Sequence, residues 1–149
     1  MNLADRAKEF LYKGIREVGG SASHPQIYEW LKRTEKIYPT DLKIDDSTYA
    51  WCGVFVGCMV LDERLANPTF PKPPSYFQGA KNWLKWGTKV EIDRAQRGDV
   101  IVVKRTGGHH VTIISSITKN GFACIGGNQS DSISIVEYPF SKVVGVRRG

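Results

Sequence analysis

Apolar residues recur at helical spacing in the first half of the chain and at every second position in much of the second half. From Leu3 to Val18, and again from Ile27 to Leu31, they repeat every three or four residues, which predicts amphipathic helices. After residue 88 the period becomes two, and we expect five strands within 100–103, 111–117, 122–125, 133–136 and 143–146. Helices followed by an antiparallel sheet indicate the α+β class.

Capping residues place the predicted helix ends. The glycine pair at 19–20 is expected to end the first helix, and Ser23 with Gln26 forms a capping box for the second. A further box at 75–78 is expected to cap a fourth helix, which Gly87 ends.

A third helix, expected from about Tyr49 to Leu65, is apolar on nearly every side through its first three turns. A helix with this pattern is buried. The stretch from Tyr38 to Ser47 before it is polar and rich in turn residues. The length suits one domain, so we expect a single domain, 1–149, with a helical part at 1–47 and a core at 48–149.

Composition limits where such a protein can work. Lys and Arg total 21 against 15 acidic residues, a net charge of +6 that is spread along the chain. A dispersed charge of this size favours solubility and also suits polyanionic partners, such as nucleic acid or a bacterial envelope. The longest apolar run, from Ala50 to Leu61, is too short to span a bilayer. Residues 1–20 lack the apolar region of a signal peptide, so we expect synthesis in the cytoplasm without one.

The three cysteines differ in their surroundings. Their odd number argues against a disulfide framework. Cys58 and Cys124 stand among apolar neighbours, as core cysteines do. Cys52 stands where the buried helix begins, and the positive end of a helix dipole favours the reactive thiolate there. Cys52 is therefore a candidate nucleophile, with a place in the core as the alternative.

Two segments of the predicted sheet could complete a site around this thiol. His109 and His110 open a strand directly after a glycine turn, and a thiolate nucleophile needs a neighbouring imidazole for proton transfer. Alternation sends the two rings to opposite faces, so only one can face the thiol. The segment Gly126-Gly127-Asn128-Gln129 ends the next strand. An amide there could orient the ring, although Gly-Gly-Asn also suits a plain turn.

Other chemistries lack their residue patterns. The spacing of Cys52 and Cys58 fits no standard zinc pair and the histidines are adjacent, so neither a metal nor another cofactor is expected. The chain has neither a phosphate-binding Gly-x-x-x-x-Gly-Lys nor a dinucleotide fingerprint. No pattern indicates which residues bind a substrate.

Together these segments resemble a known family. Trp51-Cys52-Gly53-Val54-Phe55-Val56 is similar to the nucleophile helix of the papain-like peptidoglycan hydrolases, in particular the cysteine, histidine-dependent amidohydrolase/peptidase (CHAP) and NlpC-type group. Further segments are similar to a phage-associated branch of that group, at 80–87, 97–103, 108–111, 126–129 and 144–147. Each motif is weak alone, but the order of Cys, His and Asn with the linking segments in place is specific.

The resemblance implies a fold and a reaction. The fold would be papain-like, with the nucleophile helix packed on an antiparallel sheet of about five strands. The reaction would be hydrolysis of an amide bond in the peptide part of bacterial peptidoglycan, with Cys52 as nucleophile, His110 as general base and Asn128 orienting the imidazole. His110 is preferred to His109 because the family's histidine directly precedes the strand valine. Many members carry a glutamate two residues before the asparagine, where this chain has Gly126.

The resemblance also implies where such an enzyme works. It would be an endolysin-like monomer whose partner is peptidoglycan rather than nucleic acid, acting in the periplasm or cell wall after release by a holin. Which peptide or amide bond is cut stays open. The rival hypothesis is a basic, non-enzymatic binding protein for nucleic acid or an anionic envelope. Such a binder has no need of Cys52, His110 and Asn128 together.

The hairpin between the strands of His110 and Asn128 decides whether these two residues share a face. A three-residue loop at 119–121, with Gly121 left-handed, would bring Asn128 onto the His110 face, as would a bulge that restores the same parity. A regular two-residue turn would place Gln129 on that face instead. The Asn128 hypothesis therefore predicts the three-residue loop or a bulge.

Overall fold

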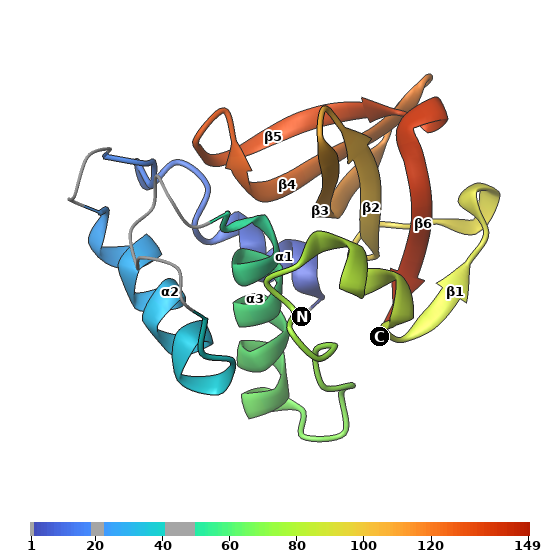
Figure 1. Cartoon of the computed structure of the whole chain (residues 1–149). Helices are drawn as coiled ribbons and strands as arrows, with labels where there is room; N and C mark the ends of the chain where they lie inside the picture. Colours follow the sequence, from blue (N-terminus) through green and yellow to red (C-terminus); the bar gives the residue numbers. More distant parts are fainter. Residues whose placement is uncertain (1, 19–22, 41–49) are drawn as a thin grey trace.

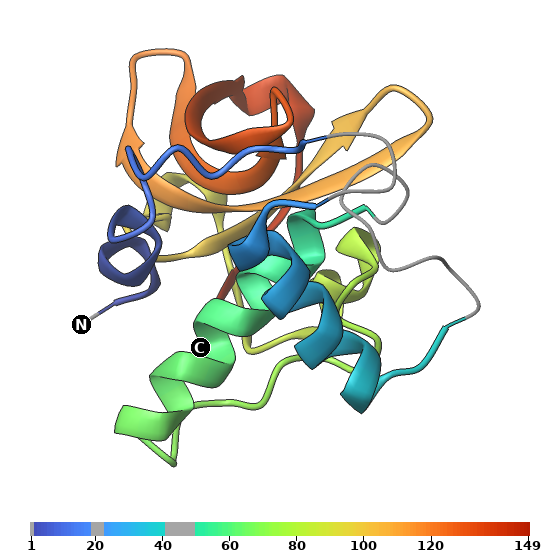
Figure 2. The ribbon, with the colours of Figure 1, turned by 90° about the vertical axis from the view of Figure 1, so that its left-hand side faces the viewer.

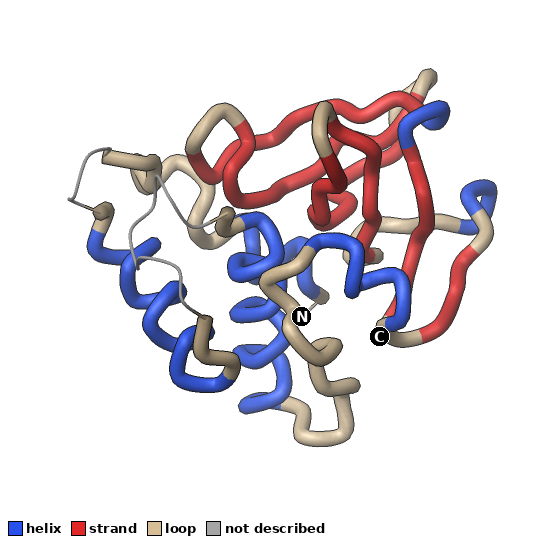
Figure 3. Tube along the Cα trace, in the orientation of Figure 1, coloured by secondary structure: helices blue, strands red, loops and turns tan. Residues whose placement is uncertain are grey.

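The computed structural model describes residues 2–18, 23–40 and 50–149, and in it helices lie on one side of an antiparallel sheet (Figure 1; Figure 3). The expected α+β class is confirmed. With η marking a 3-10 helix, the elements are α1 Leu3–Lys8, α2 Pro25–Ile37, α3 Cys52–Ala66, η1 Ala80–Lys85, β1 Thr88–Val90, η2 Ile92–Arg94, β2 Val100–Arg105, β3 Gly108–Ile117, β4 Gly121–Gln129, β5 Ser132–Pro139, η3 Phe140–Lys142 and β6 Val143–Arg148.

The sheet has six strands in the order β1-β6-β2-β3-β4-β5, and each neighbouring pair is antiparallel. The expectation of about five strands misses β1, because its three residues are too few to show an alternating pattern. In the hairpin of β2 and β3, Val103 pairs with His110 and Arg105 pairs with Gly108. Arg105 and His110 therefore share one face of the sheet.

Two apolar layers cover the two faces of the sheet. Helix α3 packs against β3 and β4, and α1 and α2 lie against α3 (Figure 2). Val111 of β3 belongs to the layer that contains α3, whereas Val103 and Cys124 belong to the layer on the opposite face. Neighbouring residues of a strand alternate, so His110 leaves β3 on the face away from the body of α3.

The first helix is shorter than the apolar spacing predicts. It ends at Lys8 instead of reaching Val18, and Tyr12 and Gly14 have φ values of 69°. Beyond them, the Ile15 carbonyl accepts a hydrogen bond from Ile133 N–H at 3.0 Å. The backbone at 15–17 therefore lies beside the start of β5, and these sheet-type hydrogen bonds replace the helical ones. The expected glycine stop at 19–20 lies outside the described residues.

The other helices form with caps that differ from the expected ones. Helix α2 begins after His24, whose Nδ1 accepts from Gln26 N–H at 3.1 Å, so His24 and not Ser23 is the N-cap. The fourth helix is the short 3-10 helix η1, preceded by Gly79, and Gly87 follows it with a φ of 58°. Most of the expected polar loop, from residue 41 on, lies outside the described residues. None of the helices in the described ranges is long and apolar enough to cross a membrane.

Candidate active site

Cys52 is the first residue of α3, where the sequence predicted the helix to begin. Packing fixes this helix start. The Trp51 ring is fully buried and donates from Nε1 to Glu17 Oε1 at 2.8 Å. A Cβ at Gly53 would collide with the backbone carbonyl of Phe77, so only glycine lets the first turn lie this close to that segment. The position of the thiol is thus set by its neighbours on both sides.

The Cys52 thiol is nearly buried, with 4% of the residue exposed. Burial raises the pKa of this thiol, and the Val111 backbone N–H, the charge of Arg105 and the Gly53 backbone N–H oppose that rise. The thiol is therefore protonated in the free protein near neutral pH, and it needs a base to become a nucleophile.

His110 supplies a buried imidazole on β3, with 1% of the residue exposed. Its Nε2 lies 3.1 Å from the Gln129 side-chain oxygen Oε1, and its ring stands beside that of Tyr138 with 5.6 Å between centroids. Burial, followed by the charge of Arg105, lowers the pKa of His110 to about 4, although the Gln129 hydrogen bond acts in the opposite direction. The ring is therefore a neutral base near pH 7.

The amide of Gln129 determines which nitrogen of His110 carries the proton. Gln129 Nε2 donates to the backbone carbonyls of Cys124 and Ser134, at 3.2 and 2.7 Å, so the amide cannot be reversed without losing both bonds. The Gln129 oxygen must then face His110, and an oxygen accepts only from a protonated nitrogen. His110 is therefore the Nε2–H tautomer, and Nδ1 carries the free lone pair.

The Gln129 oxygen is itself held by further donors. Thr112 Oγ1 donates to it at 2.9 Å and the Tyr138 hydroxyl at 3.1 Å, in addition to His110. Gln129 is 2% exposed, so removal of its amide would leave the buried His110 and Thr112 without this partner. Neither Thr112 nor Tyr138 was singled out from the sequence.

Asn128 does not take the position that the sequence predicted for it. Its backbone is left-handed, with a φ of 58°, and its carbonyl accepts from Arg105 Nη2 at 3.4 Å, while Gln129 holds the His110 ring. Asparagine tolerates the left-handed region better than most residues. In the structure Asn128 therefore serves as the turn residue, and Gln129 takes the orienting position.

Two irregularities in the sheet explain this outcome. Phe122 pairs with Ile117, whereas the predicted loop at 119–121 would pair it with residue 118, and Gly121 is not left-handed, so the predicted three-residue loop is wrong. A bulge between Ile114 and Ser116 shifts the register of β3 against β4 by one residue, as the Asn128 hypothesis requires. If this register continued to the end of β4, Asn128 would lie opposite His110. A second register shift, between Gly126 and Gln129, moves the following side chains to the opposite face again, so that Gln129 and not Asn128 lies on the His110 face. The bulge is confirmed, but the placement of Asn128 is wrong.

The two glycines before Asn128 make this arrangement possible. A Cβ at Gly126 would collide with Thr112 Oγ1 and lie 2.8 Å from Gln129 Oε1, so the Gln129 amide occupies the space that a side chain at 126 would need. A Cβ at Gly127 would lie 2.7 Å from the Trp51 ring. Gly126 therefore admits the orienting amide, and Gly127 admits the residue that precedes Cys52.

Cys52 reaches the strand of His110 through the backbone of Val111 and not through the His110 ring. The thiol meets the backbone N–H of Val111, the residue after His110, and the ladder between β3 and β4 ends nearby at Ile113–Ile125. The structure shows no hydrogen bond between the thiol and the ring. Arg105 Nη1 instead lies 3.3 Å from His110 Nδ1. A small movement of Arg105 would leave the lone pair of Nδ1 free.

The thiols of the other two cysteines make no hydrogen bond with Cys52, His110 or Gln129. Cys58 and Cys124 are fully buried, and burial raises the pKa of Cys58 to about 12 and also raises that of Cys124. The three thiols are free. His109 pairs with Lys104 and so lies on the sheet face opposite to His110. Among the residues that the structure describes, no cluster of three His, Cys, Asp or Glu side chains could hold a metal ion.

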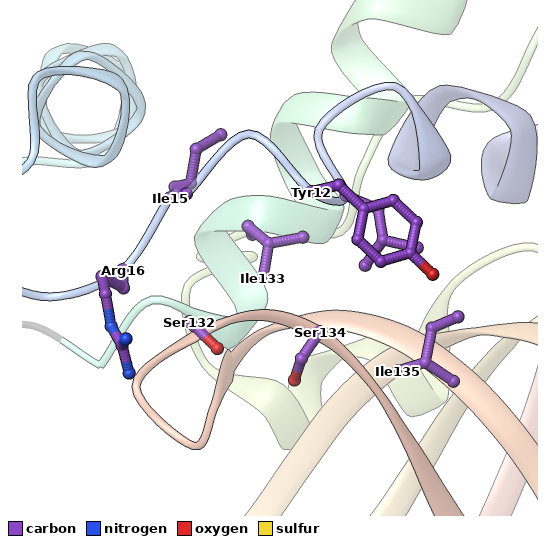
Figure 4. A pocket seen from close by; sticks show the side chains of 9 residues that line it. Tyr12, Ile15, Arg16, Ser132, Ile133, Ser134 and Ile135 are labelled. Atoms are coloured by element: carbon purple, nitrogen blue, oxygen red, sulfur yellow. The ribbon is translucent and has the colours of Figure 1, made fainter.

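A groove of about 440 Å³ lies between residues 11–16 and the start of β5 (Figure 4). Ser132 and Ser134 line it, and both hydroxyls donate to the Gln129 backbone carbonyl, at 3.0 and 2.9 Å. The groove therefore adjoins the residue that holds His110 and does not include the thiol.

Comparison with known proteins adds no relative: no protein-family model matches the chain, and a search of curated proteins finds no significant match.

Proposed function

We propose that the protein is a cysteine amidase or endopeptidase that hydrolyses an amide bond in the peptide part of bacterial peptidoglycan. One observation carries the catalytic part of this proposal: Gln129 holds His110 as the Nε2–H tautomer, so Nδ1 is its basic nitrogen, and the Cys52 thiol meets the backbone N–H of the next residue, Val111. A nucleophile, a base and a group that orients the base are the parts that thiol hydrolysis requires.

The substrate part of the proposal rests on the resemblance of the Cys52 helix, the His110 strand and the 126–129 segment to CHAP and NlpC-type hydrolases. Many of those enzymes have glutamate at the position of Gly126, and in this chain a different side chain occupies the space beside that position. The space next to Gly126 is filled by the amide of Gln129, which supplies an oxygen to the imidazole in place of a carboxylate. Gln129 thus takes the part that the resemblance assigned to Asn128. A papain-like fold is part of the same proposal.

The proposed reaction uses His110 Nδ1 in both directions. Nδ1 takes the proton of the Cys52 thiol, and the sulfur attacks the carbonyl carbon of the scissile amide. The C–N bond breaks as Nδ1 gives its proton to the leaving amine, which leaves a thioester on Cys52. Water then adds to the thioester carbon and gives its proton to Nδ1. The C–S bond breaks, the sulfur regains that proton, and the product carboxylic acid leaves. The Cys52 backbone N–H is one donor for the oxyanion.

Purified sacculi test the proposal. The wild-type protein is expected to lower their turbidity and release fragments whose masses identify the cut bond, and alkylation of Cys52 should abolish this activity. A chelator should leave it intact, because the proposed mechanism uses no metal. Binding to sacculi, to anionic vesicles or to DNA without release of fragments would favour the rival hypothesis of a basic binding protein and contradict the enzyme.

A further inference from the structure

Arg105 is an exposed cation next to the candidate site and has no role in the mechanism above. It ends β2 and pairs with Gly108 across a two-residue turn, and it shares a sheet face with His110. Its guanidinium lies 3.3 Å from His110 Nδ1 through one nitrogen and 3.4 Å from the Asn128 carbonyl through another. Arg105 therefore contacts both β3 and β4 beside His110.

Arg105 also lacks a counter-ion in the part of the chain that the structure describes. Four other arginines form ion pairs of 3.0 Å or less, as Arg6–Glu63, Arg33–Asp62, Arg97–Asp5 and Arg148–Asp99. No described carboxylate lies within ion-pair distance of Arg105. Its two contacts are long, and each goes to a neutral acceptor. A carboxylate would therefore be a stronger partner for this guanidinium than either of its present ones.

The charge of Arg105 reaches the reacting groups. It lowers the pKa of His110, and it acts in the same direction on the thiol of Cys52 and the hydroxyl of Tyr138, although burial dominates in all three. An anion bound to Arg105 would therefore lie next to the His110 ring, within the range at which Arg105 acts electrostatically on the thiol. By drawing the guanidinium away from Nδ1, it would also leave that nitrogen free to accept the thiol proton.

We propose that Arg105 binds a free carboxylate of the substrate next to the scissile amide, and that this exchange releases His110 Nδ1 for catalysis. The ligand class is a peptide with a carboxylate adjacent to the bond that is cut, which the stem peptides of peptidoglycan provide. The inference rests on the proposed function, and it makes Arg105 a specificity-determining residue of the same site. A guanidinium suits this task because its two parallel N–H donors match the two carboxylate oxygens.

The first test needs no catalysis. Alkylation of Cys52 is followed by mass spectrometry with iodoacetate and with iodoacetamide, which have the same reacting carbon but differ in charge. The quantity compared is the rate with iodoacetate divided by the rate with iodoacetamide. This ratio is expected to be about fivefold higher in the wild type than in R105Q, the size expected for one exposed charge pair. R105K should keep most of this preference. The matched control is K104Q, because Lys104 is the neighbouring exposed cation but lies on the other sheet face.

The second test uses two synthetic stem peptides that differ only in whether the carboxylate next to the scissile amide is free or amidated. The wild type and K104Q should prefer the free acid by about tenfold or more in kcat/KM, chiefly through KM, and R105Q should lose the preference. If the wild type cleaves neither peptide, the proposed function fails, and the alkylation ratio alone decides the role of Arg105. Equal ratios in the wild type and R105Q, or faster cleavage of both peptides by R105Q, would overturn the inference.

Discussion

The two nitrogens of His110 face surroundings of opposite character. On the Nε2 side, Gln129 makes its hydrogen bonds in the protein interior and is 2% exposed. On the Nδ1 side, the exposed Arg105 makes one long contact, and in the proposed mechanism this nitrogen receives the proton of the Cys52 thiol. In the proposed mechanism these two sides have separate tasks: the buried side fixes the tautomer before a substrate arrives, and the open side rearranges when one binds.

Removing the thiol on the open side should have the largest effect. Cys52→Ala is expected to abolish hydrolysis of sacculi, by at least about a thousandfold, because no other group can form the thioester. The protein should stay folded by circular dichroism. Cys58→Ala and Cys124→Ala are the matched controls. They remove buried sulfur away from the site and should lower the free energy of unfolding by at most a few kcal/mol while retaining activity. Substantial hydrolysis by folded Cys52→Ala would contradict the mechanism.

Breaking the buried side should have the next largest effect. Gln129→Ala is expected to lower kcat by about a hundredfold and the free energy of unfolding by about 2–4 kcal/mol, because it leaves buried donors and acceptors unpaired. Nitrogen NMR of the His110 ring reports the tautomer directly and should show loss of the pure Nε2–H form. Asn128→Gly keeps the left-handed backbone and is the control. If that variant lost as much activity as Gln129→Ala, Asn128 and not Gln129 would belong to the site.

A smaller effect should appear in the pH dependence of stability. The folded protein keeps His110 neutral down to about pH 4, whereas an ordinary histidine, with a pKa of 6.5, is protonated in the unfolded chain below that value. Between these values the unfolded chain binds more protons, so the free energy of unfolding falls as the pH drops. The expected contribution is about 2 kcal/mol between pH 7 and pH 4.5.

Urea unfolding of the wild type and His110→Gln at both pH values measures this contribution. Whatever the stability of the variant at pH 7, its loss of stability on acidification should be smaller than that of the wild type by the stated amount. The carboxyl of Asp5, whose pKa its hydrogen bond with Arg97 lowers, adds the same acid sensitivity to both proteins. Equal losses in the two proteins would show that the ring of His110 is not held neutral by the fold.

Several features of the site follow from local sequence rules. The apolar run after Trp51 predicts a buried helix, and the polar residues before it place its start near Cys52, as the structure has it. Alternation along a strand separates His109 from His110 without reference to the rest of the chain. These predictions succeed because helical period, strand period and chain reversal depend on residues that are close in the sequence.

Other features depended on contacts between distant segments. The apolar spacing up to Val18 predicts a longer first helix, but the backbone at 15–17 pairs beside β5 instead. The sequence also left open whether Asn128 or Gln129 faces His110. A bulge in β3 and a register shift in β4 decide it, and a one-residue shift exchanges every side chain between the two faces.

The sequence by itself determined that a cysteine begins a buried helix, that a histidine begins a strand, and that amides follow a glycine pair. Only the tertiary structure decided which amide holds the His110 ring and which cation contacts its other nitrogen. The physical reason is steric. Gly127 must admit the Trp51 ring and Gly126 must admit the Gln129 amide, and these close approaches accompany the turn at Asn128. The first of these approaches joins residues more than 70 positions apart in the chain (Trp51 and Gly127), which no local pattern records.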